Sequence, residues 1–137
     1  MKEGKGVYKY KNGDIYNGEW SQEKKEGKGS FKFQNGDTYT GQWKSDKYDG
    51  YGVFISTCGD KYEGEWKNNK REGEGVLYYK SGKYEGEFKN DMRDGKGTVF
   101  YRNGNIYDGF YKENKKMKGL GALYDSFGNV LEDDYHK

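Results

Sequence analysis

Residues 27–43 read GKGSFKFQNGDTYTGQW, and this stretch decides the fold. In Gly29–Phe33 and again in Thr38–Trp43, aromatic or glycine positions alternate with polar ones, which is the pattern of a strand with two different faces. Between them stand Asn35 and Gly36, residue types that accept the positive φ angles of tight hairpin turns. The stretch therefore predicts a β-hairpin.

The same phrase returns along the chain about every 22 or 23 residues, and a fixed period of this length indicates one structural unit stacked repeatedly. The motif Tyr-x-Gly-x-aromatic occurs at Tyr16-x-Gly18-x-Trp20, Tyr39-x-Gly41-x-Trp43, Tyr62-x-Gly64-x-Trp66, Tyr84-x-Gly86-x-Phe88 and Tyr107-x-Gly109-x-Tyr111. A Gly-x-Gly pair keeps step with it at Gly4, Gly27, Gly50, Gly73, Gly95 and Gly119. We therefore expect residues 1–137 to form one array.

The fold class predicted is all-β, a single-layer twisted antiparallel sheet of about six consecutive hairpins in the shape of a trough. The hairpins are expected at about 4–20, 27–43, 50–66, 73–88, 95–111 and, in divergent form, 119–135. The chain has no proline. This agrees with central strands, in which proline is disfavoured because it cannot donate a backbone hydrogen bond to the neighbouring strand.

Side-chain alternation predicts that each large ring lies over a glycine of the facing strand, which would offset the cost of glycine in a strand. In the second repeat the expected opposite pairs are Phe33 with Tyr39, Phe31 with Gly41 and Gly29 with Trp43. A bulged turn of the same parity would shift these partners by two residues, and the sequence leaves both registers open.

The fourth repeat is one residue shorter between its two halves, and a slip inside a strand would turn every aromatic side chain to the other face. We therefore expect the deletion in the turn, as a two-residue Ser81-Gly82 loop with Gly75 opposite Phe88 and Leu77 opposite Gly86. The six-residue connectors between hairpins are expected to be polar and exposed: Ser21–Glu26, Lys44–Asp49, Lys67–Glu72 and Lys89–Asp94.

The last unit departs from the pattern, since Leu131, Asp133 and Tyr135 take the places of Tyr, Gly and Trp. The acidic run from Glu132 to Asp134 predicts a polar cap that prevents end-to-end stacking.

Composition agrees with a thin core, because 18% of the residues are aromatic, 35% are charged and no long apolar run is present. The balance of 25 basic and 23 acidic residues argues against a nucleic-acid partner, which would call for a concentrated basic stripe. With a single cysteine, Cys58, no internal disulfide can form. No secretory or membrane-spanning segment is recognised, so an intracellular, soluble protein is expected.

No constellation in the sequence predicts catalysis. Cys58 and His136 lie in different repeats and are interpreted as bystanders, and acidic pairs such as Glu63 and Glu65 are interpreted as a solvated sheet face. No cluster of metal ligands stands out. The prediction is a protein that is not an enzyme, with no catalytic residue, metal or cofactor.

The phrase Tyr-x-Gly-x-Trp, a polar connector and Gly-x-Gly-x-aromatic resemble the MORN repeat, named for membrane occupation and recognition nexus. The resemblance covers residues 4–124 well and the remainder loosely. It implies the hairpin array already expected, and a place in the kinds of assembly that use this repeat: junctional membrane proteins, lipid kinases, ciliary radial spokes, cytoskeletal proteins and myosin-binding adaptors. The location it implies is cytoplasmic, at a cytoskeletal, ciliary or membrane-peripheral structure.

Two binding hypotheses remain open, and homo-oligomerisation is open beside them. In the first, the chain is a scaffold that binds an elongated helical or extended protein segment through its aromatic ladder. The candidate partner-binding residues are Tyr16, Trp20, Tyr39, Trp43, Tyr62, Trp66, Tyr84, Phe88, Tyr107 and Tyr111. In the second, basic connectors bind anionic phospholipids. The candidate residues are Lys67, Lys70, Arg71, Lys112, Lys115, Lys116 and Lys118.

Overall fold

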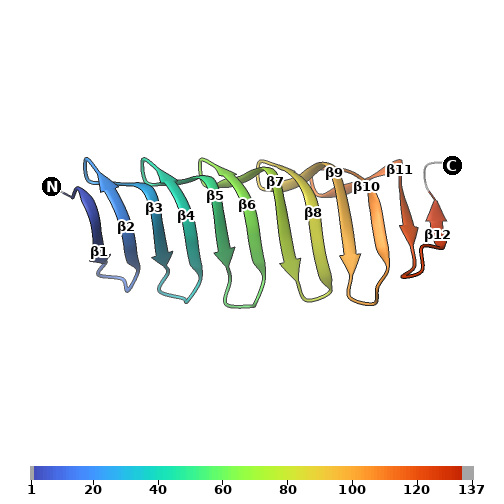
Figure 1. The fold of residues 1–137 in the computed structure, drawn as a ribbon, viewed down its shortest axis with the longest axis horizontal. Coiled ribbons are helices and arrows are strands. Elements are labelled where there is room, and N and C mark those ends of the chain that lie inside the picture. Colours follow the sequence, from blue (N-terminus) through green and yellow to red (C-terminus); the bar gives the residue numbers. More distant parts are fainter. Residues whose placement is uncertain (1, 134–137) are drawn as a thin grey trace. The chain divides into compact units, whose positions relative to one another are not determined.

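A computed structural model describes residues 2–133, and all regular structure in that range is β-strand (Figure 1). The strands are β1 Gly4–Lys9, β2 Ile15–Ser21, β3 Lys24–Lys32, β4 Thr38–Lys44, β5 Lys47–Ile55, β6 Lys61–Lys67, β7 Lys70–Tyr79, β8 Gly82–Lys89, β9 Met92–Tyr101, β10 Ile106–Lys112, β11 Lys115–Tyr124 and β12 Val130–Asp133. They follow chain order as consecutive antiparallel hairpins in an open sheet, so the predicted fold class is confirmed. Two compact units divide the chain, Met1–Lys70 and Arg71–Lys137.

Of the two registers that the sequence leaves open for the second hairpin, the structure has the one shifted by two residues, and the predicted faces are right. Gly27 is opposite Trp43, Gly29 opposite Gly41 and Phe31 opposite Tyr39. The cause is the turn, in which the Phe33 N–H donates to the Asp37 carbonyl at 2.9 Å and the Gly36 N–H donates to the Phe33 carbonyl at 2.9 Å. This three-residue loop needs its last residue in the left-handed region, and Gly36 has φ 100°.

The fourth hairpin takes up its deletion in the turn as expected, with a shift of the same kind. Its two-residue loop is Lys80-Ser81, since Tyr79 pairs with Gly82. Gly73 therefore lies opposite Phe88, and the predicted pairing of Gly75 with Phe88 is wrong. Gly75 faces Gly86, and Leu77 faces Tyr84 where Gly86 was expected.

The predicted six-residue connectors are the ends of longer strands. β2 runs to Ser21 and β3 begins at Lys24, which leaves only Gln22 and Glu23 to turn the chain. Both have positive φ, 51° and 65°, as a type I′ turn requires, and this turn fits the right-handed twist of the flanking strands. The same pair of positive φ angles recurs at Ser45-Asp46, Asn68-Asn69, Asn90-Asp91 and Glu113-Asn114.

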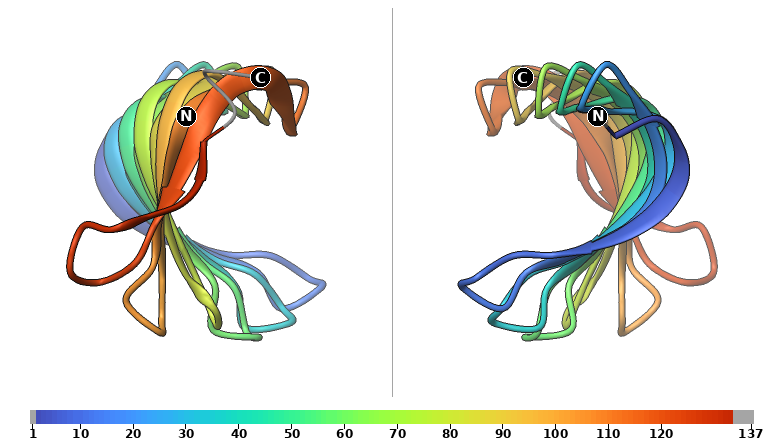
Figure 2. Two further views of the ribbon diagram at one scale, coloured as in Figure 1. Left: turned by 90° about the vertical axis from the view of Figure 1, so that its right-hand side faces the viewer. Right: turned by 90° about the vertical axis from the view of Figure 1, so that its left-hand side faces the viewer.

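A β-bulge interrupts β3, β5, β9 and β11 at the first glycine of the Gly-x-Gly pair. Between β2 and β3 the register shifts because one residue, Glu19, faces the three residues from Glu26 to Lys28. Gly27 in this bulge has φ 79°, a conformation that side chains rarely adopt. In Figure 2 the strands of each unit curve along their own length, as bulged strands do.

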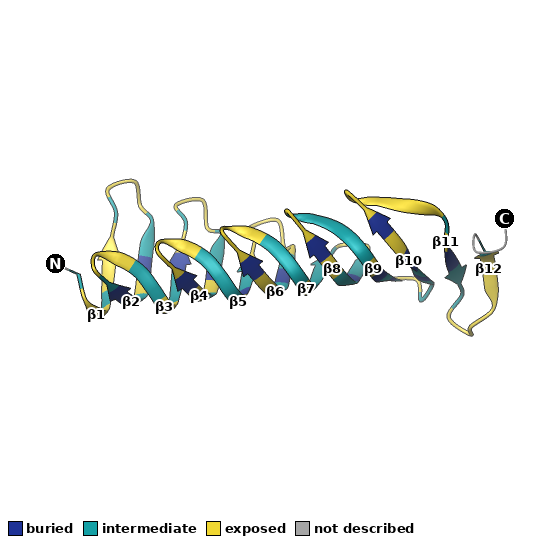
Figure 3. Ribbon diagram, turned by 90° about the horizontal axis from the view of Figure 1, so that it is seen from above, coloured by how far each residue is buried: buried dark blue, intermediate teal, exposed yellow. Residues whose placement is uncertain are grey.

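Burial recurs once per hairpin (Figure 3). Tyr16, Tyr39 and Tyr84 are completely buried, and so nearly is Tyr111. At the C-terminal end β12 pairs with β11, and Leu131 in the tyrosine place is 51% exposed. The predicted cap residue Asp134 lies outside the described residues, as do Tyr135 in the tryptophan place and His136.

Candidate interaction surface

The sheet has two chemically different faces, which we name by their residues. The ring face carries the Tyr, Gly and aromatic positions of the motif, for example Tyr16, Gly18 and Trp20. The polar face carries the residues between them, for example Asn17 and Glu19. Because side chains alternate along a strand, every motif copy presents the same two sets.

On the ring face, four motif tyrosines each lie over a pair of glycines, which we call a glycine seat: Tyr16, Tyr39, Tyr84 and Tyr107. A methyl group built on Gly29 would overlap the Tyr16 ring, and one built on Gly18 would come within 2.7 Å of the Tyr16 hydroxyl oxygen. That hydroxyl donates to the Glu19 carbonyl at 2.8 Å. Burial raises the pKa of Tyr16 to about 12, as expected for a phenol that would be ionised away from water.

The seat repeats along the chain. The hydroxyls of Tyr39, Tyr62 and Tyr84 donate in the same way to the carbonyls of Gln42, Glu65 and Glu87, at 2.8 to 2.9 Å. At Gly29, Gly52, Gly97 and Gly121, the second glycines of four pairs, a tyrosine thus occupies the space that a side chain would need.

The tryptophans join neighbouring hairpins of the first unit. The Trp43 Nε1–H donates to the Gly29 carbonyl at 3.0 Å, and Trp43 meets Tyr16 and Tyr39 edge-on with ring centroids 5.4 and 5.1 Å apart. The Trp66 Nε1–H likewise donates to the Gly52 carbonyl at 3.1 Å. These rings act as a continuous core for a sheet that has no second layer.

All ten candidate partner-binding residues are therefore buried. Their exposed fractions are 8% or less: Tyr16, Trp20, Tyr39, Trp43, Tyr62, Trp66, Tyr84, Phe88, Tyr107 and Tyr111. Their surfaces are occupied by glycines, by backbone carbonyls and by one another. A partner on the ring face would rest mainly on the residues that surround them.

Sequence reasoning missed a second aromatic row, which we call the outer row. Its half-buried members are Tyr10, Phe33 and Phe54 in the first unit and Tyr79 and Tyr101 in the second. Ring contacts connect Phe33 to Phe31 at 4.7 Å and to Phe54 at 6.2 Å. The signal was present in the sequence, because an aromatic residue recurs two or four positions after the second glycine of each of the first five pairs.

A small groove opens beside the outer row of the first unit. Its volume is about 170 Å³, and its lining includes Phe33, Trp43 and Tyr48 together with Lys25 and Asp46. The Tyr48 ring stacks on Tyr39, with the centroids 3.8 Å apart. The groove thus offers aromatic walls with an ion pair at the rim.

Cations also lie on the ring face, just after the type I′ turns. The Lys25 Nζ lies 5.3 Å from the Trp43 ring centroid and 3.3 Å from an Asp46 carboxylate oxygen. In the second unit, the Arg93 guanidinium carbon lies 5.0 Å from the Tyr111 ring centroid, and the Lys116 Nζ lies 3.9 Å from that of Tyr107. These contacts are cation–π interactions.

The candidate phospholipid-binding residues do not behave as one group. Arg71 contacts the Phe88 ring at 5.2 Å and ion-pairs with Asp91 at 3.2 Å, so its charge is used inside the second unit. The remaining members are exposed: Lys67 and Lys70 in the first unit, and Lys112, Lys115, Lys116 and Lys118 in the second.

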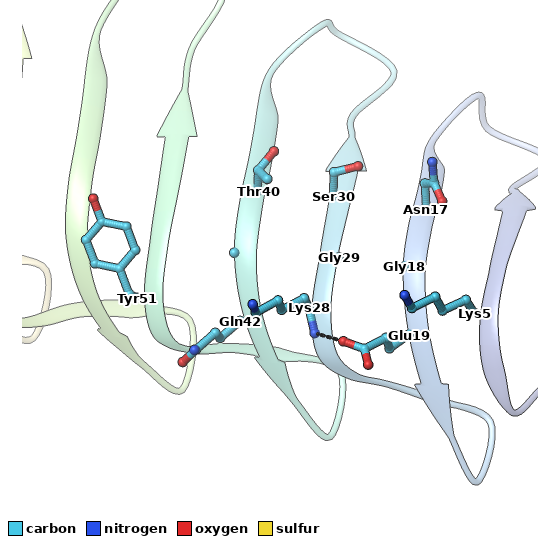
Figure 4. A pocket seen from close by; sticks show the side chains of 11 residues that line it. Lys5, Asn17, Gly18, Glu19, Lys28, Gly29, Ser30, Thr40, Gln42 and Tyr51 are labelled. Atoms are coloured by element: carbon cyan, nitrogen blue, oxygen red, sulfur yellow. Dashed lines mark hydrogen bonds between the residues drawn. The ribbon is translucent and has the colours of Figure 1, made fainter.

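The polar face of the first unit holds a broad open hollow of about 840 Å³ (Figure 4). Gly18, Gly29 and Gly41 form its floor, and its walls are polar side chains and Tyr51. Across it the Lys28 N–H donates to the Glu19 carboxylate at 2.6 Å, so this side chain closes the bulge. The hollow holds none of the Ser-His or Cys-His arrangements that nucleophilic catalysis requires.

Within residues 2–133 no group of three or more His, Cys, Asp or Glu is placed to hold a metal ion. Cys58 is exposed, and its sulfur lies 2.8 Å from the Ser56 hydroxyl oxygen. No helix in the described part of the chain is long and apolar enough to cross a membrane.

The repeat motif, the glycine seats and the hairpin geometry define a class of protein, the single-sheet repeat arrays. The sequence model of the MORN repeat matches residues 1–15, 16–38, 39–61, 62–83 and 84–106, so the chain belongs to the MORN repeat family. A search of curated proteins found no match. MORN repeats are a repeat-based interaction or membrane-associated module and are generally non-enzymatic.

Proposed function

We propose that this chain is a non-enzymatic scaffold that binds an elongated protein segment along the ring face, in a cytoskeletal, ciliary or membrane-associated assembly of the cytoplasm. The buried motif rings hold the sheet rigid, and the outer row makes the contact. The proposal therefore assigns binding to the outer row and no longer to the motif rings.

The observation that carries the proposal is the spacing of the outer row. Tyr10 and Phe33 occupy equivalent positions in the first two hairpins, four residues after the second glycine, and equivalent positions two strands apart in a sheet are about 9.6 Å apart. Phe54 of the third hairpin stands two residues after its glycine and extends the row, with its ring centroid 6.2 Å from that of Phe33. A row at this spacing fits an amphipathic helix, in which nearly two turns match each step, or an extended strand, in which about three residues do. Half-exposed aromatic rings give such a partner a large contact area at a low entropic cost.

The test is a selection of displayed helical and extended peptides on the intact chain, followed by affinity measurements with variants. Phe33→Ser with Phe54→Ser should weaken the selected peptides at least about tenfold, because two contact rings are lost. Tyr51→Ser is the matched control, since Tyr51 is 55% exposed but belongs to the polar face. If the double variant and the Tyr51→Ser control both fold and lose peptide affinity equally, the outer row is not the binding surface.

Peripheral binding to anionic phospholipids through the basic connectors is the second candidate. The observation in its favour is that Lys67, Lys70, Lys112, Lys115 and Lys118 are exposed beside the type I′ turns. Each lysine near an anionic membrane contributes about 1 kcal/mol, and the attraction weakens with salt. Sedimentation with phosphatidylserine vesicles at two salt concentrations, with these lysines changed to glutamine, separates this candidate from the scaffold.

A further inference from the structure

The polar face of the first unit carries unpaired positive charge over β1 and β3. Four lysines are exposed on it: Lys5, Lys9, Lys28 and Lys32. Within the part of the chain that the structure describes, none of their ammonium groups has an ion-pair or hydrogen-bond partner. The Glu19 carboxylate of β2, between β1 and β3, accepts the backbone N–H of Lys28 at 2.6 Å. Positive charge is therefore in excess on this face.

The fold does not require these lysines. In the third hairpin the place of Lys28 is held by Tyr51, and the place of Lys32 is held by Ile55. That hairpin has the same strands and the same pairing of glycines. Because like charges on one face repel each other, lysines that the sheet can do without indicate a ligand that neutralises them.

Unpaired polar groups lie among the lysines. Asn17, Ser30 and Thr40 are side by side across β2, β3 and β4 and border the hollow (Figure 4). In the described residues their side chains make no hydrogen bond to other protein groups. An amide and two hydroxyls provide both donors and acceptors, so the hollow can bind peptide groups as well as charges.

The spacing of the lysines suits an anion with several charges along its length. Lys9 and Lys32 stand on either side of Ile15, two strands apart and hence about 9.6 Å from each other. Lys5 and Lys9 are four residues apart in β1, which is about 13 Å. A single phosphate or carboxylate is much smaller than this area, whereas a chain of carboxylates covers it.

The surroundings favour a polypeptide over a single-stranded nucleic acid. Nucleic acid strands are bound by a series of exposed rings on which successive bases stack. Among the described strands of the first unit, the polar face has one aromatic side chain, Tyr51. A peptide needs no such series, because its carboxylates pair with lysines and its backbone groups bond to the polar row.

We propose that the polar face of the first unit binds an acidic polypeptide segment in the hollow among Lys5, Lys9, Lys28 and Lys32. The carboxylates of the segment pair with the lysines, and its backbone groups bond to the row of Asn17, Ser30 and Thr40. This site lies on the opposite side of the sheet from the outer row. The chain thus has a second binding surface beyond the one assigned to the scaffold.

The probe is a fluorescent decaglutamate peptide, titrated with the full chain and followed by anisotropy. We expect saturable binding, and none with decaglutamine. Lys28→Gln with Lys32→Gln should weaken the binding of decaglutamate about tenfold at low salt. The matched control is Lys89→Gln with Lys96→Gln, which removes the same charge from exposed positions of the second unit and should bind normally. Lys96 holds the place of Lys28 in its own hairpin.

A third variant tests the hollow without changing any charge. Thr40→Trp places an indole in the hollow and should weaken decaglutamate binding at least about fivefold. The variant should fold normally, because Thr40 is exposed and tryptophan is well suited to strands. General attraction between opposite charges would leave the affinity of this variant unchanged.

Three results would overturn the proposal: no saturable binding of decaglutamate, equal loss in the two double variants, or full affinity in Thr40→Trp. Decathymidylate and phosphatidylserine vesicles are measured in the same buffer. If either binds more tightly than decaglutamate and is lost in the Lys28→Gln, Lys32→Gln variant, the face belongs to nucleic acid or to lipid and the proposal is wrong.

Discussion

The glycine seats make a quantitative prediction that compares two glycines of the same motif position. Gly52→Ala adds a methyl group where the Tyr39 ring lies, with the ring carbon Cε1 only 2.7 Å from it. Gly6→Ala adds the same methyl group to an empty seat. Neither residue has a positive φ, so the two substitutions differ in what the methyl group meets.

The expected cost follows from what Tyr39 would lose on moving. Its ring is completely buried and stacks on Tyr48, and its hydroxyl donates to the Gln42 carbonyl at 2.8 Å. Forcing extra volume into a packed site costs about 1–3 kcal/mol, and the lost hydrogen bond adds about 1 kcal/mol. Gly52→Ala should therefore lower the free energy of unfolding by about 2–4 kcal/mol. Gly6→Ala should change it by less than about 0.5 kcal/mol, or slightly increase it by restricting the unfolded chain.

Urea denaturation followed by tryptophan fluorescence measures this difference, because the three tryptophans, Trp20, Trp43 and Trp66, all belong to the first unit. In a Tyr39→Ala background the Gly52→Ala substitution should cost almost nothing, since no ring remains to clash, and such non-additivity is the signature of direct contact. Equal denaturation midpoints for Gly52→Ala and Gly6→Ala would refute the claim that the Tyr39 ring is what requires glycine at position 52.

Further predictions concern ionisation, turns and bulges. Burial raises the pKa of Tyr16, Tyr48 and Tyr84 from 10.0 to about 12. The stability that these neutral phenols contribute is therefore complete below pH 10 and is lost as the pH rises to about 12. Circular dichroism recorded between pH 10 and about 12 should show alkaline unfolding. Cys58→Asn should increase the free energy of unfolding by about 0.5–1 kcal/mol and so raise the denaturation midpoint. The reason is that Asn35, in the equivalent turn, accepts the Asp37 N–H at 2.9 Å. A lower midpoint would contradict this. Glu19→Ala should destabilise the first unit by about 1–2 kcal/mol in urea, because the Lys28 N–H loses its acceptor, while Gln22→Asn in the exposed turn should be neutral or stabilising.

The sequence determines which residues share a face but leaves their exact partners to the turn. Phe31, Tyr39 and Trp43 were assigned to one face correctly, because alternation depends only on parity. The register depended on whether Gly36 would take a left-handed conformation in a three-residue loop. An Asn-Gly pair is compatible with that loop and with a two-residue turn, so composition alone could not choose.

The connectors were misjudged for a related reason. Ser45 and Asp46 are polar residues of ordinary type, and nothing in their identity announces two consecutive positive φ angles. The conformation is supported from outside the turn, since the Asp46 carboxylate accepts the Lys25 N–H at 2.8 Å and the Asp46 N–H donates to the Lys25 carbonyl at 3.0 Å. Such bonds between hairpins appear only once the sheet is assembled.

The repeats themselves separate residues that build the array from residues that vary between copies. The seat position is tyrosine in every complete copy of the motif, at Tyr16, Tyr39, Tyr62, Tyr84 and Tyr107, because one ring fits over a pair of glycines. The position four residues after the second glycine, which holds every outer-row member except Phe54, varies from Phe33 to Ser56 to Tyr79. A sheet one layer thick must use its most regular aromatic residues to hold itself together. If the proposed scaffold function holds, discrimination between partners therefore falls to the irregular ones.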